Sequence, residues 1–271
     1  KEGAAIPEPS TAAPMAASNG MSNGIKHVLV QEAGTLRNVL CENLSLETDT
    51  FRFLVDLGAV YVNKVRAKAG AYDIGVEKDS YVRVHTVPRR FPIATSTKWR
   101  DRIVHASEDF VVVNKPGGVP AHCTADNNVE TAEASAGREL GVFVCALHRL
   151  DVPTHGLLVL GRSQVFMSHF ARLLRLHRVN KEYLALATVP PPLGFLTHYM
   201  KNSKRSPKLI VREPTEDWME CKLEVLTVTP LTRSQLSERA IGVIEAQARG
   251  FRNEHGAPLE MHEATGGGAD C

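Results

Sequence analysis

The run HRLDVPTHGLLVL, from His148 to Leu160, constrains the fold of this chain more than any other segment. Its charged first part ends at Asp151, a Thr-x-Gly turn follows, and an apolar run closes it. Because a short apolar run bounded by a turn is typical of a buried strand, the turn is expected to hold the Asp151 carboxylate at the edge of a packed core. A carboxylate placed there beside Arg149 stays ionised while it loses water, which suits a nucleophile. An Asp before a turn is more often only a turn former or a cap, so the Asp alone does not decide the matter.

The same run resembles the signature of the RluA-type RNA pseudouridine synthases, H-R-L-D-x-x-T-S-G-L-L-L-L. His155 stands where that family has Ser, and Val159 stands where it has Leu. Two further segments resemble the family in the same order along the chain. Residues 108–122, EDFVVVNKPGGVPAH, look like its strand and N-K-P-x-G-x-P-x-H loop, and residues 180–186, NKEYLAL, look like its K-x-Y-x-A-L strand. The resemblance is specific from about residue 99 to residue 200.

The resemblance implies a site centred on Asp151, the expected catalytic carboxylate, which acts either as a nucleophile or as the base that starts elimination. Tyr183 matches the family tyrosine that packs against a flipped-out uracil, with a core tyrosine as the alternative. Arg149 is expected to contact phosphate, or to form only a structural ion pair. Pseudouridine formation needs no energy source, so no cofactor and no metal are expected. The substrate-binding residues implied by the matched motifs are His148, Arg149, Thr154, Lys181, Asn114 and Lys115, with Arg233 as a weaker candidate.

The C-terminal motif of the family, G-R/K-T-H-Q-I-R, has no clean counterpart in this chain. Its basic residue pairs with the catalytic Asp in the family and keeps that carboxylate ionised. The nearest segments are residues 230–236, PLTRSQL, and residues 244–249, IEAQAR, and neither has a His-Gln pair followed by Arg. Arg233 and Arg249 are the candidate replacements. Either the C-terminal third has diverged, or the sequence reflects an altered reading frame or splice.

Charge is distributed unevenly, although the formal net charge is only +2. Residues 152–212 hold ten Lys or Arg and one acid, whereas residues 213–271 hold five Lys or Arg and eleven acids. A basic stretch beside a candidate catalytic loop is typical of a protein that binds a polyanion such as RNA, and a solvated basic face is the alternative. The five cysteines form no C-x-x-C pair, so a structural zinc is not expected. No apolar stretch approaches the roughly 18 to 20 residues of a membrane helix.

Composition divides the chain into four parts. Residues 1–27 are rich in Ala, Ser, Pro and Gly and are expected to be a disordered leader, either the tail of an organelle transit peptide or ordinary disorder. Residues 35–92 are expected to form a small α+β module, and residues 99–262 the catalytic domain. Residues 263–271 are expected to be a disordered tail.

The small module is expected to hold helices at residues 36–46 and 51–57 and strands at residues 58–63 and 81–85. Its sequence, FLVDLGAVYVN followed by YVRVH, resembles the S-four-like RNA-binding module, which is named after a ribosomal small-subunit protein. The usual Gly-Asp before the last strand of that module is replaced here by Asp79-Ser80. A plain α+β cap domain is the alternative.

In the catalytic domain, an amphipathic helix is expected at residues 164–178, with Ser163 as its N-cap. Its apolar stripe is expected to pack into the core, and residues 200–208 are expected to form a basic loop. The apolar stripe comprises Phe166, Phe170, Leu173 and Leu174, and the expected strands are residues 110–113, 157–160, 183–189 and 221–229.

The sequence therefore predicts an α/β (mixed α+β) protein, in which a pseudouridine synthase domain with a largely antiparallel mixed sheet follows a small S-four-like module. The predicted function is an RNA pseudouridine synthase acting on uridines of rRNA or tRNA. A catalytically weak or inactive RNA-binding relative is the alternative, whereas a kinase is excluded because the glycine-rich loop and D-F-G are missing. The sequence of residues 99–199 looks closest to the plant and algal branch of the family. This favours a location in the chloroplast, then in the mitochondrion, over the cytoplasm. RNA is the expected partner of a monomer, with no membrane involved.

Overall fold

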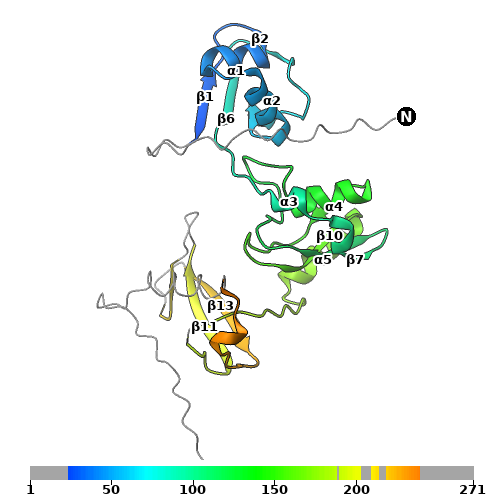
Figure 1. Ribbon diagram of the computed structural model, residues 1–271, viewed down its shortest axis with the longest axis vertical. Helices are drawn as coiled ribbons and strands as arrows, with labels where there is room; N and C mark the ends of the chain where they lie inside the picture. Colours follow the sequence, from blue (N-terminus) through cyan, green and yellow to red (C-terminus); the bar gives the residue numbers. More distant parts are fainter. Residues whose placement is uncertain (1–23, 188, 203–208, 214–217, 239–271) are drawn as a thin grey trace, which may run out of the picture. The chain divides into compact units, whose positions relative to one another are not determined.

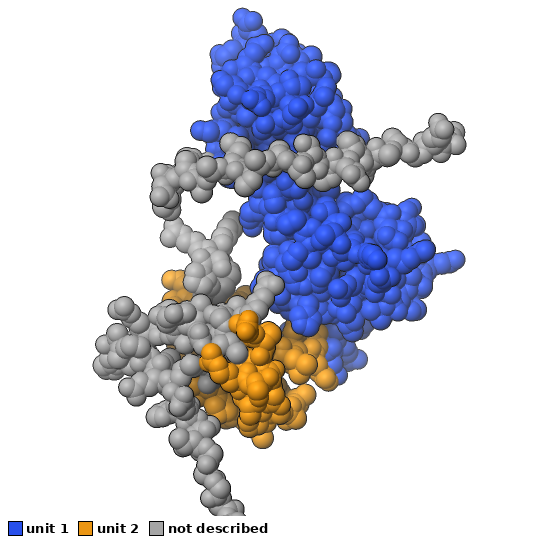
Figure 2. All heavy atoms as spheres, in the orientation of Figure 1, with its two compact units in different colours: residues 1–180 blue, residues 181–271 orange. Residues whose placement is uncertain are grey.

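The structure is a computed structural model, which describes residues 24–187, 189–202, 209–213 and 218–238. It divides the chain into two compact units, residues 1–180 and residues 181–271, which Figure 2 shows in different colours. Every strand pairing in the described residues is antiparallel, so the predicted mixed α+β fold with a largely antiparallel sheet is confirmed. No helix among these residues is both long enough and apolar enough to cross a bilayer. The predicted tail, residues 263–271, lies outside the described residues.

The first part of unit 1 is a four-stranded sheet, in the order β1-β6-β3-β4, with two helices packed against it (Figure 1). The predicted helices and strands of this module are confirmed. The prediction that the disordered leader extends to residue 27 is wrong at its end, because β1 begins at Ile25, and residues 1–23 lie outside the description. Both helices have a cap that explains their bounds: the Thr35 side chain accepts from Asn38 N, and left-handed Gly58 donates to the end of the second helix. The elements are β1 (Ile25–Leu29), α1 (Leu36–Leu44), α2 (Thr48–Leu57), β3 (Val60–Val62), β4 (Val65–Arg66) and β6 (Tyr81–His85), with the separate pair β2 (Gly34–Thr35) and β5 (Gly75–Val76).

The second part of unit 1 has its own core around a sheet in the order β7-β8-β10-β9. Strands β8 and β10 pair along their whole length, and alternate residues of both, such as Val113 and Leu158, are fully buried. The predicted strands at residues 110–113 and 157–160 are therefore confirmed. The elements are α3 (Ile93–Ser96), the 3-10 helix η1 (Trp99–Arg102), β7 (Ile103–Ala106), β8 (Phe110–Lys115), α4 (Ala132–Leu140), β9 (Cys145–Ala146), β10 (Gly156–Gly161) and α5 (Gln164–Arg175).

Helix α5 begins where the sequence predicts and ends three residues earlier, at Arg175. Ser163 is its N-cap, since the hydroxyl accepts from Phe166 N at 3.2 Å. The predicted packing of the apolar stripe is confirmed only in part: Phe166, Phe170, Leu173 and Leu174 are half-buried, and no residue of α5 is fully buried. The reason is that the helix meets the sheet mainly through its rings: Phe166 stacks on Phe110 with centroids 4.5 Å apart, and Phe170 stacks on Phe166.

Two arginines after β6 hold the loop that precedes α4. Arg89 donates to the Asp126 carboxylate through its backbone N and its guanidinium, and Arg90 donates to the Glu130 carboxylate. Hydrogen bonds also join the module to this loop, from the Tyr61 hydroxyl to Ala125 O at 2.8 Å. Both carboxylates are almost fully buried, so each depends on its arginine for compensation. These contacts hold the two cores of unit 1 together.

Unit 2 is built on a three-stranded sheet in the order β12-β11-β13. The predicted strand at residues 221–229 is present, shifted toward the N-terminus as β13 (Trp218–Val225). The prediction of a strand at residues 183–189 is wrong for the residues described, since residues 183–187 have no strand partner, and residue 188 lies outside the description. The predicted basic loop, residues 200–208, begins with two residues that belong to β11, and residues 203–208 lie outside the description. The other elements are β11 (Gly194–Lys201), β12 (Ile210–Val211) and the 3-10 helix η2 (Arg233–Gln235).

Candidate active site

The Asp151 carboxylate lies at the entrance to the β8–β10 core, as the sequence predicts. Leu150 is buried immediately before it, and Thr154 N donates to Asp151 O at 3.0 Å to close a turn. The chain then enters β10, whose first residue pairs with the last residue of β8. The side chain of Asp151 is 74% exposed, so a substrate reaches it without any rearrangement of the core.

A second loop, residues 116–119, packs against the Asp151 turn. Gly118 N donates to Val152 O at 2.7 Å. At Gly117, a Cβ would lie only 2.9 Å from Pro153 O, so a side chain there would displace the turn. Gly117 is therefore needed for the close approach of the two loops.

Lys115 is fully buried at the end of β8 and binds both loops. Its ammonium donates to Val119 O at 2.6 Å, to Pro116 O at 3.1 Å and to Val152 O at 3.4 Å. Burial lowers the pKa of Lys115 to about 8, and the Asp151 carboxylate opposes this shift. The sequence implied a substrate contact for this lysine, whereas its position suits it to hold the Asp151 turn, and we propose that role instead.

Arg149, two residues before Asp151 in the sequence, forms an ion pair with it. Its guanidinium lies 3.5 Å from the carboxylate, and both side chains are largely exposed. Exposed pairs of this kind contribute between 0 and about 1 kcal/mol, so Arg149 is free to exchange Asp151 for a phosphate group at little cost. The geometry fits either of the roles expected for it.

The remaining residues of unit 1 in the site are tied to the sheet. His148 Nε2 accepts a hydrogen bond from Val159 N at 3.1 Å, which requires an unprotonated Nε2. Asn114 pairs with Leu157 across β8 and β10 and is half-buried. Thr154 is half-buried in the turn itself. The structure thus brings together Asp151 with its neighbours from two matched motifs.

Three predicted site residues belong to unit 2. Tyr183 is 61% exposed in a segment without regular secondary structure, and Lys181 lies exposed two residues before it. Arg233 begins η2 and is exposed. Their approach to Asp151 remains a prediction, and Arg249 lies outside the described residues. Within the described ranges, no group of three or more His, Cys, Asp or Glu is placed to hold a metal ion.

Sequence reasoning missed the contacts that fix the site from a distance. Glu130 and Asp126, which hold the loop before α4, carry no motif that marks them. The backbone carbonyls that accept hydrogen bonds from Lys115 could not be predicted from the sequence either, because every residue has a carbonyl. One signal was present: Lys115 comes two residues after the apolar run Val111–Val113 and directly before Pro-Gly-Gly.

Comparison with known proteins decides the family. The family model described as RNA pseudouridylate synthase matches residues 109–263, more than half of the chain. The chain belongs to this family. The match includes the Asp151 turn, its supporting strand β8 and the Tyr183 segment, so the resemblance inferred from the three motifs is confirmed.

Several pseudouridine synthases share part of their sequence with this chain. RNA pseudouridine synthase 6, chloroplastic, of Oryza sativa is 31% identical over 203 residues, which are 74% of this chain and 41% of that protein. Its namesake in Arabidopsis thaliana is 34% identical over 152 residues, covering 55% of this chain and 32% of that protein. The human RNA Pseudouridylate Synthase Domain Containing 4 structure has a TM-score of 0.34 and 18% identity, over 48% of this chain and 54% of that one. The chain thus spans less than half the length of these plant relatives.

Proposed function

We propose that the protein is an RNA pseudouridine synthase that isomerises specific uridines of structured rRNA or tRNA to pseudouridine. The observation that carries this proposal is the exposed Asp151 carboxylate, held on a turn that Lys115 and the 116–119 loop fix from behind. Membership of the pseudouridylate synthase family supports the reaction. The names of relatives support the substrate class, since they include ribosomal large subunit and tRNA pseudouridine synthases.

In the proposed reaction, the bond between C1′ and N1 of the uridine breaks, the freed uracil turns, and a bond forms between C1′ and C5. The hydrogen on C5 then leaves to solvent as a proton, and N1 takes up a proton, so the product is an isomer of uridine. Asp151 either attacks C1′ as a nucleophile, in which case its bond to C1′ breaks as C5 bonds there, or takes a proton to start elimination. In either case the target nucleotide must leave its stack to reach the carboxylate, and the exposure of Asp151 suits a flipped nucleotide.

Tyr183 is proposed to stack on the flipped uracil, and its hydroxyl to assist removal of the C5 proton. The exposure of the ring leaves it available for this contact. Arg149 is proposed to contact a phosphate next to the target, aided by His148, Thr154, Asn114, Lys181 and Arg233 as further substrate-binding residues. The basic residues of the 152–212 segment are proposed to bind the RNA backbone.

A plastid or mitochondrion is the proposed compartment, with the chloroplast favoured. Two plant relatives carry the word chloroplastic in their names, and a relative from Saccharomyces cerevisiae, 26% identical over 139 residues, is named as a mitochondrial tRNA pseudouridine(32) synthase. We also propose that the chain acts as a monomer.

One observation favours the alternative of a weak or inactive RNA-binding relative. The Arg149–Asp151 pair is exposed and 3.5 Å long, so it is a weak ion pair on its own. The family's C-terminal basic motif supplies a second cation for this carboxylate, and the present sequence departs from it.

One experiment distinguishes the enzyme from the inactive RNA-binding relative. Its substrates are unmodified organellar rRNA and tRNA transcripts. After incubation with the protein, the RNA is digested to nucleosides, and pseudouridine is separated from uridine by chromatography. The proposal predicts pseudouridine with the wild-type protein and none with Asp151→Asn, which keeps the shape of the side chain. RNA binding by both proteins without any pseudouridine would refute the enzyme and support the alternative.

A further inference from the structure

The module of unit 1 contacts the catalytic core through one loop, residues 124–131, which we call the docking loop. The Tyr61 hydroxyl donates to Ala125 O at 2.8 Å, and Arg66 Nη2 donates to Thr124 O at 2.7 Å. Both acceptors are backbone carbonyls, so the two side chains fix the path of the loop itself. The module therefore acts on the stretch of backbone that leads into α4.

The ring of Tyr61 is itself held in place. The residue is 9% exposed, and the guanidinium carbons of Arg83 and Arg66 lie 4.2 Å and 5.1 Å from the centre of the ring. Contacts between a guanidinium and an aromatic ring are attractive, and here two of them act on one ring. The direction of the Tyr61 hydroxyl toward the docking loop is therefore fixed by the sheet of the module.

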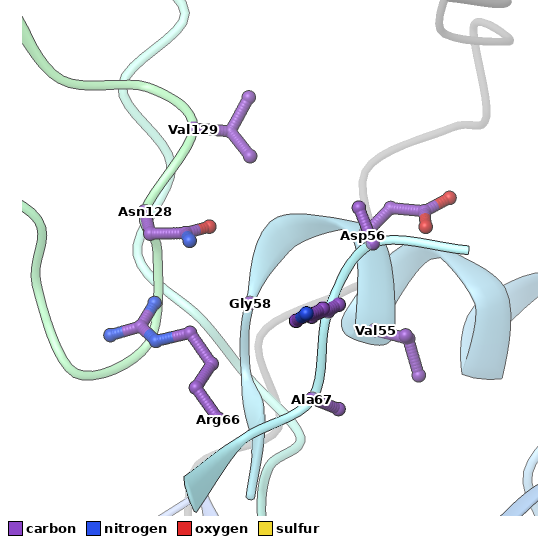
Figure 3. A pocket seen from close by; sticks show the side chains of 9 residues that line it. Val55, Asp56, Gly58, Arg66, Ala67, Asn128 and Val129 are labelled. Atoms are coloured by element: carbon purple, nitrogen blue, oxygen red, sulfur yellow. The ribbon is translucent and has the colours of Figure 1, made fainter. Parts of the chain in front are cut away.

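A third hydrogen bond of the contact runs the other way, from Asn128 N to Leu57 O at 2.9 Å. The next residue of the module, Gly58, has a φ of +80°, and a Cβ there would lie 2.4 Å from Asn128 Oδ1 and 2.7 Å from Arg66 Nη1. Figure 3 shows Gly58 beside the side chains of Arg66, from the module, and of Asn128, from the docking loop. A side chain at position 58 would push against both, so the contact depends on this glycine.

The docking loop has little freedom of its own between the module and α4. Asn127 is fully buried, and its Oδ1 accepts from Val129 N at 3.1 Å and from Glu130 N at 3.0 Å. Its Nδ2 donates to Arg89 O at 2.9 Å. Because these buried polar groups are paired with one another, a displacement at the start of the loop is passed on to its end rather than absorbed.

The end of the docking loop leads to the Asp151 turn. At the start of α4, Ala132 N donates to Pro120 O at 2.9 Å. Pro120 lies two residues after Gly118, whose N donates to Val152 O at 2.7 Å, and Val152 follows Asp151 directly. Hydrogen bonds between neighbouring backbone segments thus connect the module to the turn that carries the carboxylate.

We propose that Tyr61 and Arg66 are positioning residues for the reaction, which act through the docking loop to hold the Asp151 turn in its reactive position. The proposal rests on the proposed function for the reaction whose rate it concerns. A displacement of about 1 Å in a reacting group costs roughly 10²-fold in rate. The docked module therefore contributes to the rate of the chemical step, and not only to the binding of RNA.

The test compares Gly58→Ala with Gly70→Ala in the full chain. Gly70 belongs to the same module and has a φ of +77°, so the two substitutions impose the same kind of backbone strain. A Cβ at Gly70 would meet nothing within 4 Å, whereas one at Gly58 disturbs the contact with the docking loop. Neither substitution changes a charge, so the electrostatic attraction of RNA is the same in both variants.

RNA affinity and the rate of pseudouridine formation with protein in saturating excess over RNA are measured separately. Gly58→Ala should bind RNA like the wild-type protein and lose roughly 10- to 100-fold in this rate, whereas Gly70→Ala should keep both. Equal rates for the two variants would overturn the proposal. A weaker affinity of Gly58→Ala with an unchanged rate would overturn it as well, because the module would then act on binding alone.

A second pair of variants leaves every backbone angle unstrained. Tyr61→Phe removes only the hydroxyl that donates to Ala125 O, whereas Tyr81→Phe removes a hydroxyl of the same sheet that bonds to His27 instead. Tyr61→Phe should lower the rate with saturating protein several-fold, and Tyr81→Phe should not. The same rate for both would contradict the role of Tyr61.

Hydrogen exchange tests the path of contacts without the reaction. The amides of Gly118 and Ala132 should exchange faster in Gly58→Ala than in Gly70→Ala, while the paired amides of β8 and β10 exchange alike in the two variants. Equal exchange at Gly118 and Ala132 would overturn the proposal. A wild-type protein that forms no pseudouridine would refute the proposed function alone, because the exchange comparison still decides whether the module holds the Asp151 turn.

Discussion

The ion pair between Arg90 and Glu130 is expected to be one of the strongest single contributions to the stability of unit 1. Glu130 is 1% exposed, and its carboxylate accepts from Arg90 Nη2 at 2.6 Å, from Phe91 N at 2.7 Å and from Asn127 Nδ2 at 2.8 Å. We therefore choose Glu130→Gln, which keeps the volume, removes the charge and places an amide donor among donors. The change leaves at least one of these groups without an acceptor.

The magnitude follows from the burial of the two partners. Removing one partner of a buried ion pair costs about 3 to 5 kcal/mol. Because the Arg90 side chain is 45% exposed and regains water, the lower end applies, and we expect a loss of about 3 kcal/mol in the free energy of unfolding. The matched control is Glu139→Gln, whose partner Arg100 is 86% exposed at 3.6 Å, with an expected loss below about 1 kcal/mol.

The pH dependence gives an independent check on the same pair. Burial opposes ionisation of Glu130, but the hydrogen bonds from Arg90, Phe91 N and Asn127 outweigh it and hold the pKa of the carboxyl below its usual range. A lowered pKa in the folded state means that the unfolded state binds more protons in acid. The stabilisation is therefore complete above the ordinary glutamate value of about 4.3 and is lost as the pH falls through the folded value.

Urea denaturation followed by circular dichroism measures both quantities, at neutral pH and at several acidic values. The stability difference between the wild-type protein and Glu130→Gln should shrink as the solution becomes acidic. Equal free energies of unfolding for Glu130→Gln and Glu139→Gln at neutral pH would refute the reasoning, as would a difference that grows in acid.

Three further changes test the loops around the site. Lys115→Met should lower the free energy of unfolding by about 2 to 4 kcal/mol, because buried carbonyls lose their donor. Since the pKa of Lys115 is lowered to about 8, the wild-type protein should also gain stability over the variant as the pH rises from about 8 toward 10.5. A pH-independent difference between the two proteins would contradict this. Gly117→Ala should cost about 1 to 3 kcal/mol in urea denaturation, because its Cβ meets Pro153 O, and wild-type stability would show that the loops are not in close contact. Tyr183→Phe should bind RNA with wild-type affinity in a filter assay but form pseudouridine slowly, and an unchanged rate would exclude a role for the hydroxyl.

Local patterns were enough to predict the elements that carry Asp151. The alternation in β8, the apolar run of β10 and the cap at Ser163 are each written within a few residues, and the structure has all three. The module helices follow the same rule. The family resemblance, rather than any local pattern, supplied the roles of Asp151 and Tyr183.

Other features depend on partners far along the chain. The segment after Lys181 has the apolar character of a strand, yet a strand exists only where a neighbour completes its ladder, and residues 183–187 have none in the described structure. Arg90 and Glu130 are 40 residues apart, and no local sequence pattern around either residue predicts their ion pair.

Release of tritium from RNA labelled at C5 of uridine tests the central claim most directly, because that hydrogen leaves only when uracil is rejoined through C5. The assay uses organellar RNA with the wild-type protein and with Asp151→Asn. The account predicts release by the wild-type protein, and none by the variant, which should retain its fold and its RNA affinity. Equal release by both proteins would contradict the role of Asp151, and no release from a folded, RNA-bound wild-type protein would contradict the enzyme itself.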